Sequence, residues 1–252
     1  MKKAIDFIII SLPSSEDRRQ SVENQMREFG QEFSYFDAFD VKNLPPETSL
    51  VLQKTHQPFS GMTDGQFGCS LSHYYALKRW RDESNSDFVL IFEDDVNLTS
   101  SIIQLEKWVD TLRDLTFSVL KLGGREKKNG RWAIVLEKMK SFHIVFPFKA
   151  SFCTVAYLVR RDAIDDILEH IAVFDAQIDS KLFKQLNSKL IIAEFFPFLF
   201  YEKGFKSVID HELMLDPRAG IPQRRFRWQR DLEVIWHYFR HFGLAGRLIR
   251  IR

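Results

Sequence analysis

The stretch Phe88-Val-Leu-Ile-Phe-Glu-Asp-Asp-Val96 contains five apolar residues followed by three acidic ones. An apolar run of this length, rich in β-branched and aromatic residues, is typical of a buried strand. Ligands of open α/β sheets bind at the carboxyl ends of the strands, so Glu93, Asp94 and Asp95 are expected at a ligand site. Three adjacent carboxylates repel one another, and a hard divalent cation with oxygen ligands would compensate their charge. An exposed acidic turn would explain the same pattern, and the residues alone leave both interpretations open.

The rest of the chain alternates between strand and helix patterns. The patterns predict strands over residues 4–11, 33–39, 118–122 and 152–159, and helices over 17–29, 102–112, 162–171 and 179–190. The segment 63–73 is predicted to lead into a further helix that ends at about residue 81. The segment 42–63 contains three prolines and is predicted to be a loop. This alternation predicts one α/β domain over residues 1–216. A helical, basic extension is predicted over residues 217–252.

The overall composition is that of a globular protein with a sizeable core. The chain has 252 residues, of which 45% are hydrophobic. Cys69 and Cys153 do not form the pattern of a disulfide framework, which favours a reducing compartment. No histidine stands in the spacing of a zinc motif, so no zinc site is predicted. The first residues resemble a signal peptide, but Asp6 interrupts the apolar run and no cleavage site follows, so we interpret them as the first strand.

The positive charge is concentrated at the C-terminal end. Residues 218–252 contain nine arginines against one Asp and one Glu, a net charge of +7, which leaves −5 on the rest (27 basic against 32 acidic residues). Such asymmetry indicates an anionic partner. Apolar residues recur at helical spacing among these arginines: Leu232, Ile235, Trp236, Phe239, Leu244, Leu248 and Ile251. A basic amphipathic helix of this kind binds anionic membrane surfaces, whereas a helix packed on the domain or an oligomer contact would fit the pattern as well.

Three further segments carry side chains suited to a ligand site. Gly68-Cys-Ser-Leu-Ser-His73 places small residues and a histidine at a predicted helix start, where free N–H groups favour anions; ordinary capping with a surface histidine is the alternative. Ser11-Leu-Pro-Ser-Ser-Glu-Asp-Arg18 follows the first strand, and its arginine can neutralise a phosphate or form a salt bridge at the helix start. Cys153-Thr-Val-Ala-Tyr157 is a strand with small residues that core packing also explains.

Taken together, the segments resemble glycosyltransferase family 25, the bacterial lipooligosaccharide transferases often called β-1,4-galactosyltransferases. The order and spacing agree with the family over roughly residues 4 to 190. The matching segments are Ile8-Ile-Ile-Ser-Leu12 with Asp17-Arg18, Phe36-Asp-Ala-Phe-Asp40, Gly68-Cys-Ser-Leu-Ser-His73, Leu90-Ile-Phe-Glu-Asp-Asp95, Leu120-Lys-Leu-Gly123, Thr154-Val-Ala-Tyr157 and Ile178-Asp179. The chain departs from the usual family residues at four positions: Ser11 for Asn, Ser14 for Arg, Gln66 for Glu and Cys153 for Gly.

The resemblance implies a GT-A-like fold, a mostly parallel sheet flanked by helices with a nucleotide-sugar at the strand ends. It also implies a divalent metal, manganese or magnesium, which stabilises the charge that develops on a leaving diphosphate. We expect Asp95 to ligate this metal and Glu93 to support it directly or through water. Asp94 would bind ribose hydroxyls or a metal-bound water.

The remaining site residues follow from the same resemblance. Inversion at the anomeric centre needs a carboxylate base opposite the leaving group, and Asp179 is the candidate, although it could merely cap a helix. The expected nucleotide and donor contacts are Ser11, Leu12, Arg18, Ser72 and His73.

The predicted function is transfer of a hexose, with galactose expected, from a UDP-sugar to a lipooligosaccharide core acceptor. Glucose is a close competitor as the donor sugar. The expected location is the cytoplasm, peripheral at the inner face of the inner membrane, where the basic extension would contact anionic lipid. A non-catalytic sugar-binding homologue is the next alternative. A nucleic-acid-binding protein is disfavoured by the acidic body of the chain.

Overall fold

The computed structural model describes residues 3–124, 130–151, 153–183, 189–204, 227–243 and 247–251, with the backbone alone for 227–231. The strands are β1 (Ile5–Ser11), β2 (Ser34–Asp37), β3 (Phe88–Glu93), β4 (Val96–Asn97), β5 (Val119–Lys121), β6 (Arg131–Lys138), β7 (His143–Pro147), β8 (Ala156–Arg160), β9 (Ile192–Phe196), β10 (Tyr201–Glu202) and β11 (Arg247–Ile251). The α-helices are α1 (Glu16–Glu28), α2 (Pro46–His56), α3 (Asp64–Glu83), α4 (Ser101–Leu105), α5 (Val109–Asp114), α6 (Ile164–Ile171), α7 (Ile178–Leu182) and α9 (Arg227–Phe242).

Nine of the described strands form one sheet in the order β11-β6-β7-β9-β5-β8-β3-β1-β2. The parallel pairs are β1 with β2, β1 with β3, and β5 with β9. The other five pairs are antiparallel. Followed through these pairings, β1, β2, β3, β5, β6 and β9 point in one direction, and β7, β8 and β11 in the other. This arrangement confirms the predicted α/β class and the predominance of one strand direction. The sheet is mixed, because it contains both parallel and antiparallel pairs.

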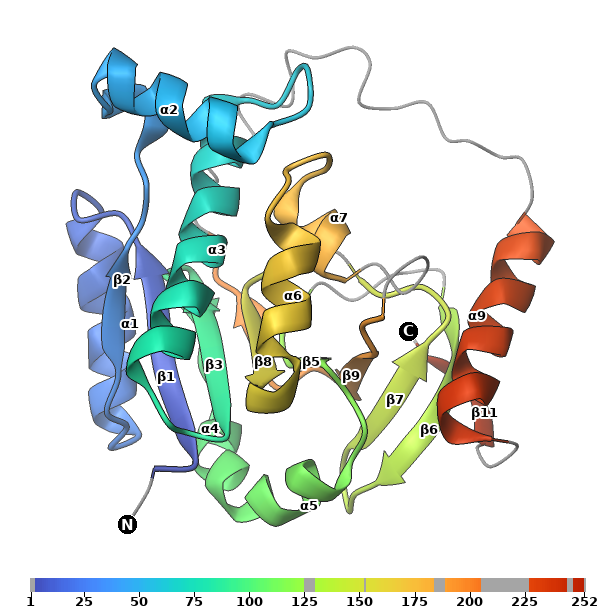
Figure 1. Ribbon diagram of the computed structural model, residues 1–252. Coiled ribbons are helices and arrows are strands. Elements are labelled where there is room, and N and C mark those ends of the chain that lie inside the picture. The colour runs from blue at the N-terminus through green and yellow to red at the C-terminus, as the bar shows by residue number, and fades with distance from the viewer. Residues whose placement is uncertain are drawn as a thin grey trace.

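Helices cover both faces of this sheet (Figure 1). The alternation along β3 shows why, because Phe88, Leu90 and Phe92 enter one apolar cluster while Val89 and Ile91 enter another. The first cluster also takes buried residues of α1, α4, α5 and α9, and the second takes those of α3, α6 and α7. A strand buried on both faces needs a continuous apolar sequence rather than an alternating one.

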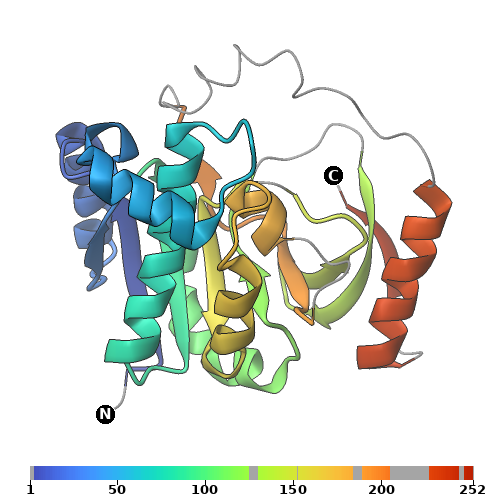
Figure 2. The same cartoon turned by 45° about the horizontal axis from the view of Figure 1, so that its top comes forward.

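The chain reverses its winding beside β1. From β1 the chain passes through α1, on one face, to β2, and it then returns through α3, on the opposite face, to β3 on the other side of β1. Such a switch point opens a crevice at the carboxyl ends of the strands. Figure 2 turns this edge of the sheet toward the viewer, with α2 and the first turns of α3 beside it.

Several predicted elements differ from the observed ones. The segment predicted as a loop contains α2, which begins with Pro46 at its N-terminal end; proline is well tolerated in a first helical turn. The predicted helix 102–112 is two short helices, α4 and α5, joined by a 3₁₀ turn at Glu106–Trp108. The predicted helix 179–190 is only α7 among the described residues, and residues 184–188 lie outside them. The predicted strand 152–159 is the later and shorter β8.

The C-terminal part contributes both a helix and a strand. Val234 and Tyr238 of α9 are buried in the main core, as the packed-helix alternative requires. The expectation that the helical pattern continues through Leu248 and Ile251 is wrong, because these residues belong to β11, which pairs antiparallel with β6. Residues 205–226, which include the predicted domain boundary at 216/217 and the arginines at 224 and 225, lie outside the described residues.

Candidate active site

A cavity of about 240 Å³ opens at the carboxyl ends of β1, β2 and β3. Its described lining comes from residues at and just after the ends of these three strands, from Ser15 and Arg18 at the start of α1, and from one side of α3 between Asp64 and His73. The acidic triplet Glu93, Asp94 and Asp95 contributes all three of its residues to the lining. The sequence expectation that the triplet stands at a ligand-binding edge of the sheet therefore agrees with the position of this cavity.

Asp94 is fixed by partners from the first strand and the first helix. The Ser11 hydroxyl donates a hydrogen bond of 2.7 Å to Oδ2 of Asp94, and Nη1 of Arg18 lies 3.0 Å from Oδ1. Arg18 thus pairs with a carboxylate 76 residues further along the chain, whereas a salt bridge at the start of its own helix was the alternative. Arg19 supports the same corner, since its guanidinium donates to the carbonyls of Ser11 and Leu12 at 2.8 and 3.1 Å.

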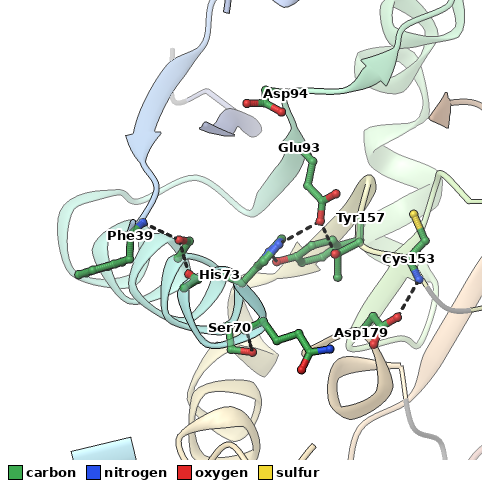
Figure 3. A network of polar contacts seen from close by, with 12 residues as sticks. Phe39, Ser70, His73, Glu93, Asp94, Cys153, Tyr157 and Asp179 are labelled. Carbon is green, nitrogen blue, oxygen red and sulfur yellow. Dashed lines mark hydrogen bonds and ion pairs between the residues drawn. The ribbon is translucent and has the colours of Figure 1, made fainter. Parts of the chain in front are cut away.

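Glu93 is oriented by two side chains, one of which is held in turn by a third (Figure 3). His73 Nε2 lies 3.3 Å from Oε1 of Glu93, and the Thr154 hydroxyl donates to the same oxygen. On its other side, His73 Nδ1 lies 2.7 Å from the Tyr157 hydroxyl. Burial alone would raise the pKa of Glu93, but the hydrogen bond and charge of His73 and the Thr154 hydroxyl lower it below its usual value. Glu93 is therefore a carboxylate kept ionised by its neighbours.

Asp95 has the opposite environment. Its side chain is buried, with 7% of the residue exposed, and its Oδ1 has no hydrogen-bond partner among the described residues. Burial, followed by the charges of Glu93, Glu202 and Asp94, raises the pKa of Asp95 to about 8, against a lowering by Arg18. A buried carboxylate with an unpaired oxygen and like charges around it lacks a cation. This donor set of carboxylate oxygens fits a hard divalent metal ion.

The segment Gly68-Cys-Ser-Leu-Ser-His73 lies inside α3 rather than at its start, which corrects one expectation. The helix begins at Asp64, and Thr63 with Gln66 forms its capping box. The N–H groups of residues 68–73 are therefore within the helix, so they are not the free donors that an anion site at a helix start would provide. Gln66, where the family usually has Glu, serves here as a cap through its side-chain oxygen, a role that either residue can fill.

Ser72 and His73 are both buried, and each has protein partners at its polar atoms. The Ser72 hydroxyl accepts from the Phe39 N–H at 2.9 Å and donates to the Gly68 carbonyl at 2.6 Å. His73 is 1% exposed and contacts Tyr157 and Glu93. The alternative of a surface histidine is therefore wrong. The two residues line the cavity, but their contacts order the loop after β2 and the Glu93 carboxylate.

Asp179 lies beside this network but is not among the described residues that line the cavity. Its Oδ2 accepts the Cys153 N–H at 3.3 Å (Figure 3). Its Oδ1 accepts the Ser180 N–H at 2.5 Å. It stands at the second position of α7, after the N-cap Gln177. Its role as the base stays a prediction, and its capping-type contact with Ser180 is present as well.

Three residues that were not predicted from the sequence as site residues lie around the site. Tyr157 positions His73, and Glu202, on β10 beside β4, places a further negative charge near Asp95. Lys121 is fully buried and donates to the Cys153 carbonyl. Burial lowers its pKa to about 8, against the raising effect of Cys153, Glu194, Asp179 and Glu93. In the sequence, Lys121 is a single charged residue in the apolar strand Val119–Lys121, and this could have indicated a buried lysine with polar partners.

Comparison with known proteins identifies relatives of the chain. A family model described as glycosyltransferase family 25 (LPS biosynthesis protein) matches residues 4–182. A Haemophilus influenzae protein named "Putative glycosyltransferase" is 28% identical over 184 residues, which are 70% of this chain and 62% of that protein. A mimivirus protein named "Putative glycosyltransferase R655" is 29% identical over 94 residues, 37% of this chain and 29% of that protein. The chain thus spans less than two thirds of the length of either relative.

Solved structures similar to this chain include two whose resemblance is distant. One is described as a glycosyltransferase involved in the glycosylation of the major capsid of PBCV-1; it has a TM-score of 0.42 and 11% identity and covers 84% of this chain and 98% of its own. The other is S. aureus TarS 1-349, with a TM-score of 0.43 and 14% identity; the match covers 96% of this chain and 73% of that one.

The family match is the stronger finding, since it spans more than two thirds of the sequence and includes every strand that ends at the cavity. The chain belongs to glycosyltransferase family 25.

Proposed function

We propose that this protein transfers a hexose, with galactose as the first candidate, from a UDP-sugar to a lipooligosaccharide core acceptor with inversion of the anomeric centre. Family membership supports the reaction class. The buried, unpaired Oδ1 of Asp95 in the cavity at the strand ends is the observation that carries the proposal. A site with a deficit of positive charge, built from carboxylate oxygens, suits a reaction in which a divalent cation accompanies a diphosphate.

The proposed cation is bound by Asp95, with Glu93 supporting it directly or through water. When bound, manganese or magnesium stabilises the negative charge that develops on the departing diphosphate. Glu93 suits this role because His73 and Thr154 leave it ionised and engage one oxygen, Oε1. Asp95 suits it because a cation offsets the repulsion that Glu93 and Asp94 impose on it.

The nucleotide is proposed to lie over the end of β1. Asp94 accepts from Ser11 and Arg18, which orient its carboxylate for hydroxyls of the ribose or for a metal-bound water. Leu12 lines the cavity next to them and supplies apolar surface. Arg18, at the edge of the same cavity, is a cation suited to a phosphate.

Asp179 is proposed to remove the proton of the acceptor hydroxyl. This proposal is supported by the position of Asp179 beside Cys153, whose neighbour Thr154 contacts Glu93.

The substitution Asp179→Asn tests this role, because it keeps the shape of the side chain and removes its basicity. We expect a loss of turnover of at least about 100-fold, with unchanged donor affinity measured by titration. Near wild-type turnover in a variant that binds the donor normally would assign the base elsewhere.

A screen of UDP-sugars with and without Mn²⁺ tests the overall proposal. We expect Mn²⁺-dependent binding and slow hydrolysis of UDP-galactose, and no response to the same sugar as a GDP or CMP conjugate. A stronger response to UDP-glucose would transfer the assignment to a glucosyltransferase of the same pathway. Binding without any UDP release, with acceptor present, would favour a non-catalytic sugar-binding homologue instead.

A second proposal concerns α9, which we infer to contact an anionic membrane surface. Its apolar side chains Leu232 and Trp236 are 57% and 72% exposed, and they stand four residues apart on the helix face opposite the buried Val234 and Tyr238. Arg240 is exposed nearby. Interfacial aromatic residues combined with basic ones are typical of such docking, and each basic residue near the surface contributes about 1 kcal/mol. No described helix has the length and hydropathy required to span a bilayer.

Vesicle sedimentation with point variants tests this docking. The variants Leu232→Ser and Trp236→Ser are expected to reduce co-sedimentation with anionic vesicles. Leu50→Ser, which changes a similarly exposed residue of α2, serves as the control and should leave it unaltered. Equal sedimentation of all variants would contradict the docking proposal. Point variants are needed because removal of the extension would also remove β11 from the sheet.

A further inference from the structure

The geometry points to a second kind of metal site in this protein, in which Cys69, His73 and Glu93 bind a soft divalent cation such as Zn²⁺. The site shares Glu93 with the carboxylate site at Asp95 but differs from it in its sulfur and nitrogen ligands, and it does not depend on the proposed transferase activity. It includes the thiol of Cys69. This cysteine does not belong to a zinc motif in the sequence, and it has no role in the proposed reaction.

Three potential ligand atoms converge at this point. The Cys69 sulfur, a His73 ring nitrogen and a Glu93 carboxylate oxygen all lie within 4.8 Å of one another. Ligands of tetrahedral zinc stand about 2.0 to 2.3 Å from the metal, which places them roughly 3.3 to 3.6 Å apart. His73 Nε2 and Glu93 Oε1 already stand 3.3 Å apart. A shift of the thiol by roughly 1.5 Å or less would complete three corners of the tetrahedron.

The secondary structure brings these ligands together. Cys69 and His73 are four residues apart in α3, so they share one face of the helix. Glu93 ends β3, and Figure 3 shows its side chain pointing toward His73. Sequence spacing alone could not reveal the set, because its third ligand lies 20 residues beyond the second on another element.

The partners of the ligands match the outer shell of a metal site. A metal-bound histidine usually donates its second ring N–H to a neighbouring acceptor. The Tyr157 hydroxyl, 2.7 Å from His73 Nδ1, is such an acceptor, because a hydroxyl can both donate and accept. Nε2 is then able to present its lone pair to the metal. The Thr154 hydroxyl fixes the Glu93 carboxylate in the same way.

The fourth position of the tetrahedron is available from the cavity. Cys69, His73 and Glu93 all belong to the lining of the cavity of about 240 Å³. A water molecule or a ligand oxygen could therefore complete the coordination, as at zinc sites with three protein ligands. A thiolate with an imidazole selects zinc or cobalt, whereas magnesium and manganese prefer oxygen ligands. Because Glu93 is also a proposed support of the catalytic cation, zinc at this site would compete with it.

The test uses the full chain, freed of metal by a chelator, and Co²⁺ as a spectroscopic probe for Zn²⁺. We expect one equivalent of Co²⁺ to produce a thiolate-to-cobalt charge-transfer band and the visible bands of four-coordinate cobalt, and Zn²⁺ to abolish both. Cys69→Ser should lose the charge-transfer band. Cys153→Ser is the matched control, since it removes the other cysteine, and it should keep the band. Excess Mg²⁺ should not displace the cobalt.

Two results would overturn the site. One is a wild-type protein that shows no charge-transfer band. The other is a band that survives Cys69→Ser or disappears in Cys153→Ser. Tyr157→Phe provides a second variant that keeps all three ligands and the shape of the core. Loss of its hydroxyl should weaken cobalt binding by roughly tenfold while the band remains, and an unchanged affinity would contradict the assigned outer shell.

Discussion

Asp94 and Asp95 are neighbours in the chain, yet their carboxylates meet opposite surroundings. Asp94 accepts hydrogen bonds from Ser11 and Arg18, and such charge-assisted bonds contribute about 1.5 to 3 kcal/mol each. Asp95 has an unpaired oxygen and is repelled by other carboxylates. The first residue is therefore already neutralised by the protein, whereas the second is neutralised only when a proton or a cation is bound. This difference is the physical basis for the separate roles proposed for them.

A pH dependence of stability follows from Asp95. Its pKa is raised from 3.8 to about 8 in the folded protein, so between these values the folded state retains a proton that the unfolded state has lost. The free energy of unfolding of the metal-free protein should therefore decrease as the pH rises through this window. Asp95→Asn should flatten this part of the profile, as measured by denaturant unfolding between about pH 5 and pH 8. Identical slopes for the two proteins would contradict the assigned environment of Asp95.

Arg18 should act mainly on binding of the donor. In Arg18→Ala, Asp94 loses the guanidinium that pairs with its Oδ1, and the cavity loses a cation suited to phosphate. We expect KM for the UDP-sugar to rise roughly tenfold, equivalent to about 1.4 kcal/mol, with a smaller change in kcat. Steady-state kinetics measure both quantities. Arg113→Ala, which removes exposed ion pairs far from the cavity, is the control; an equal effect of both substitutions would exclude a specific role of Arg18.

At the scale of elements, α3 approaches the loop after β2 so closely that Gly68 is required. A Cβ at this position would stand 2.4 Å from the Phe39 carbonyl oxygen, a backbone atom that cannot move easily. Gly68→Ala should add overpacking strain of about 1 to 3 kcal/mol, which exceeds the gain in helix propensity of about 1 kcal/mol. A lower Tm and weaker donor binding are expected.

Gly204→Ala is the control for Gly68→Ala. Nothing lies within 4 Å of the position that its Cβ would occupy, so its stability should change little. Thermal unfolding of both variants gives the comparison. A Gly68→Ala protein that is as stable as the wild type and binds the donor normally would show that the loop after β2 can move away from α3.

The elements around the cavity could be predicted because their signals are local. The apolar run of β3 ends in three acids, and β1 and α1 carry equally clear patterns, so the strand ends followed from the sequence. The hairpin of β6 and β7 and the edge strand β11 were not predicted. Their side chains alternate only weakly between buried and exposed. Their pairing depends on contacts with distant strands, which a local pattern does not contain.

The acidic residues of the site could be predicted from the sequence, but the contacts between its side chains could not. The three carboxylates and the residues of the loop after β1 share a short stretch or a strand end, and the family resemblance grouped them. The contacts of His73 could not be foreseen, because its partners Glu93 and Tyr157 come from two other strands. Whether a histidine in a helix is buried depends on how that helix packs on the sheet. The spacing of the sequence does not fix this packing.

At the scale of the whole molecule, the C-terminal strand completes the sheet at the edge far from the cavity. Ile251 of β11 is fully buried against Ala133 and Val145. Ile251→Ala should therefore cost about 2 to 5 kcal/mol of unfolding free energy, measured by denaturant unfolding. Leu248→Ala, in the same strand but 53% exposed, is the control and should cost much less. Equal effects would mean that β11 contributes no packed core.

The central claim is that Asp95 binds the divalent cation that accompanies the UDP-sugar. Calorimetric titration of Mn²⁺ into the protein with saturating UDP, for the wild type and for Asp95→Asn, tests it most directly, with Asp110→Asn of α5 as a control for the loss of one surface charge. We predict that Asp95→Asn weakens Mn²⁺ binding by at least roughly 100-fold, about 2.7 kcal/mol, while Asp110→Asn binds as the wild type does. Wild-type Mn²⁺ affinity in Asp95→Asn would contradict the claim.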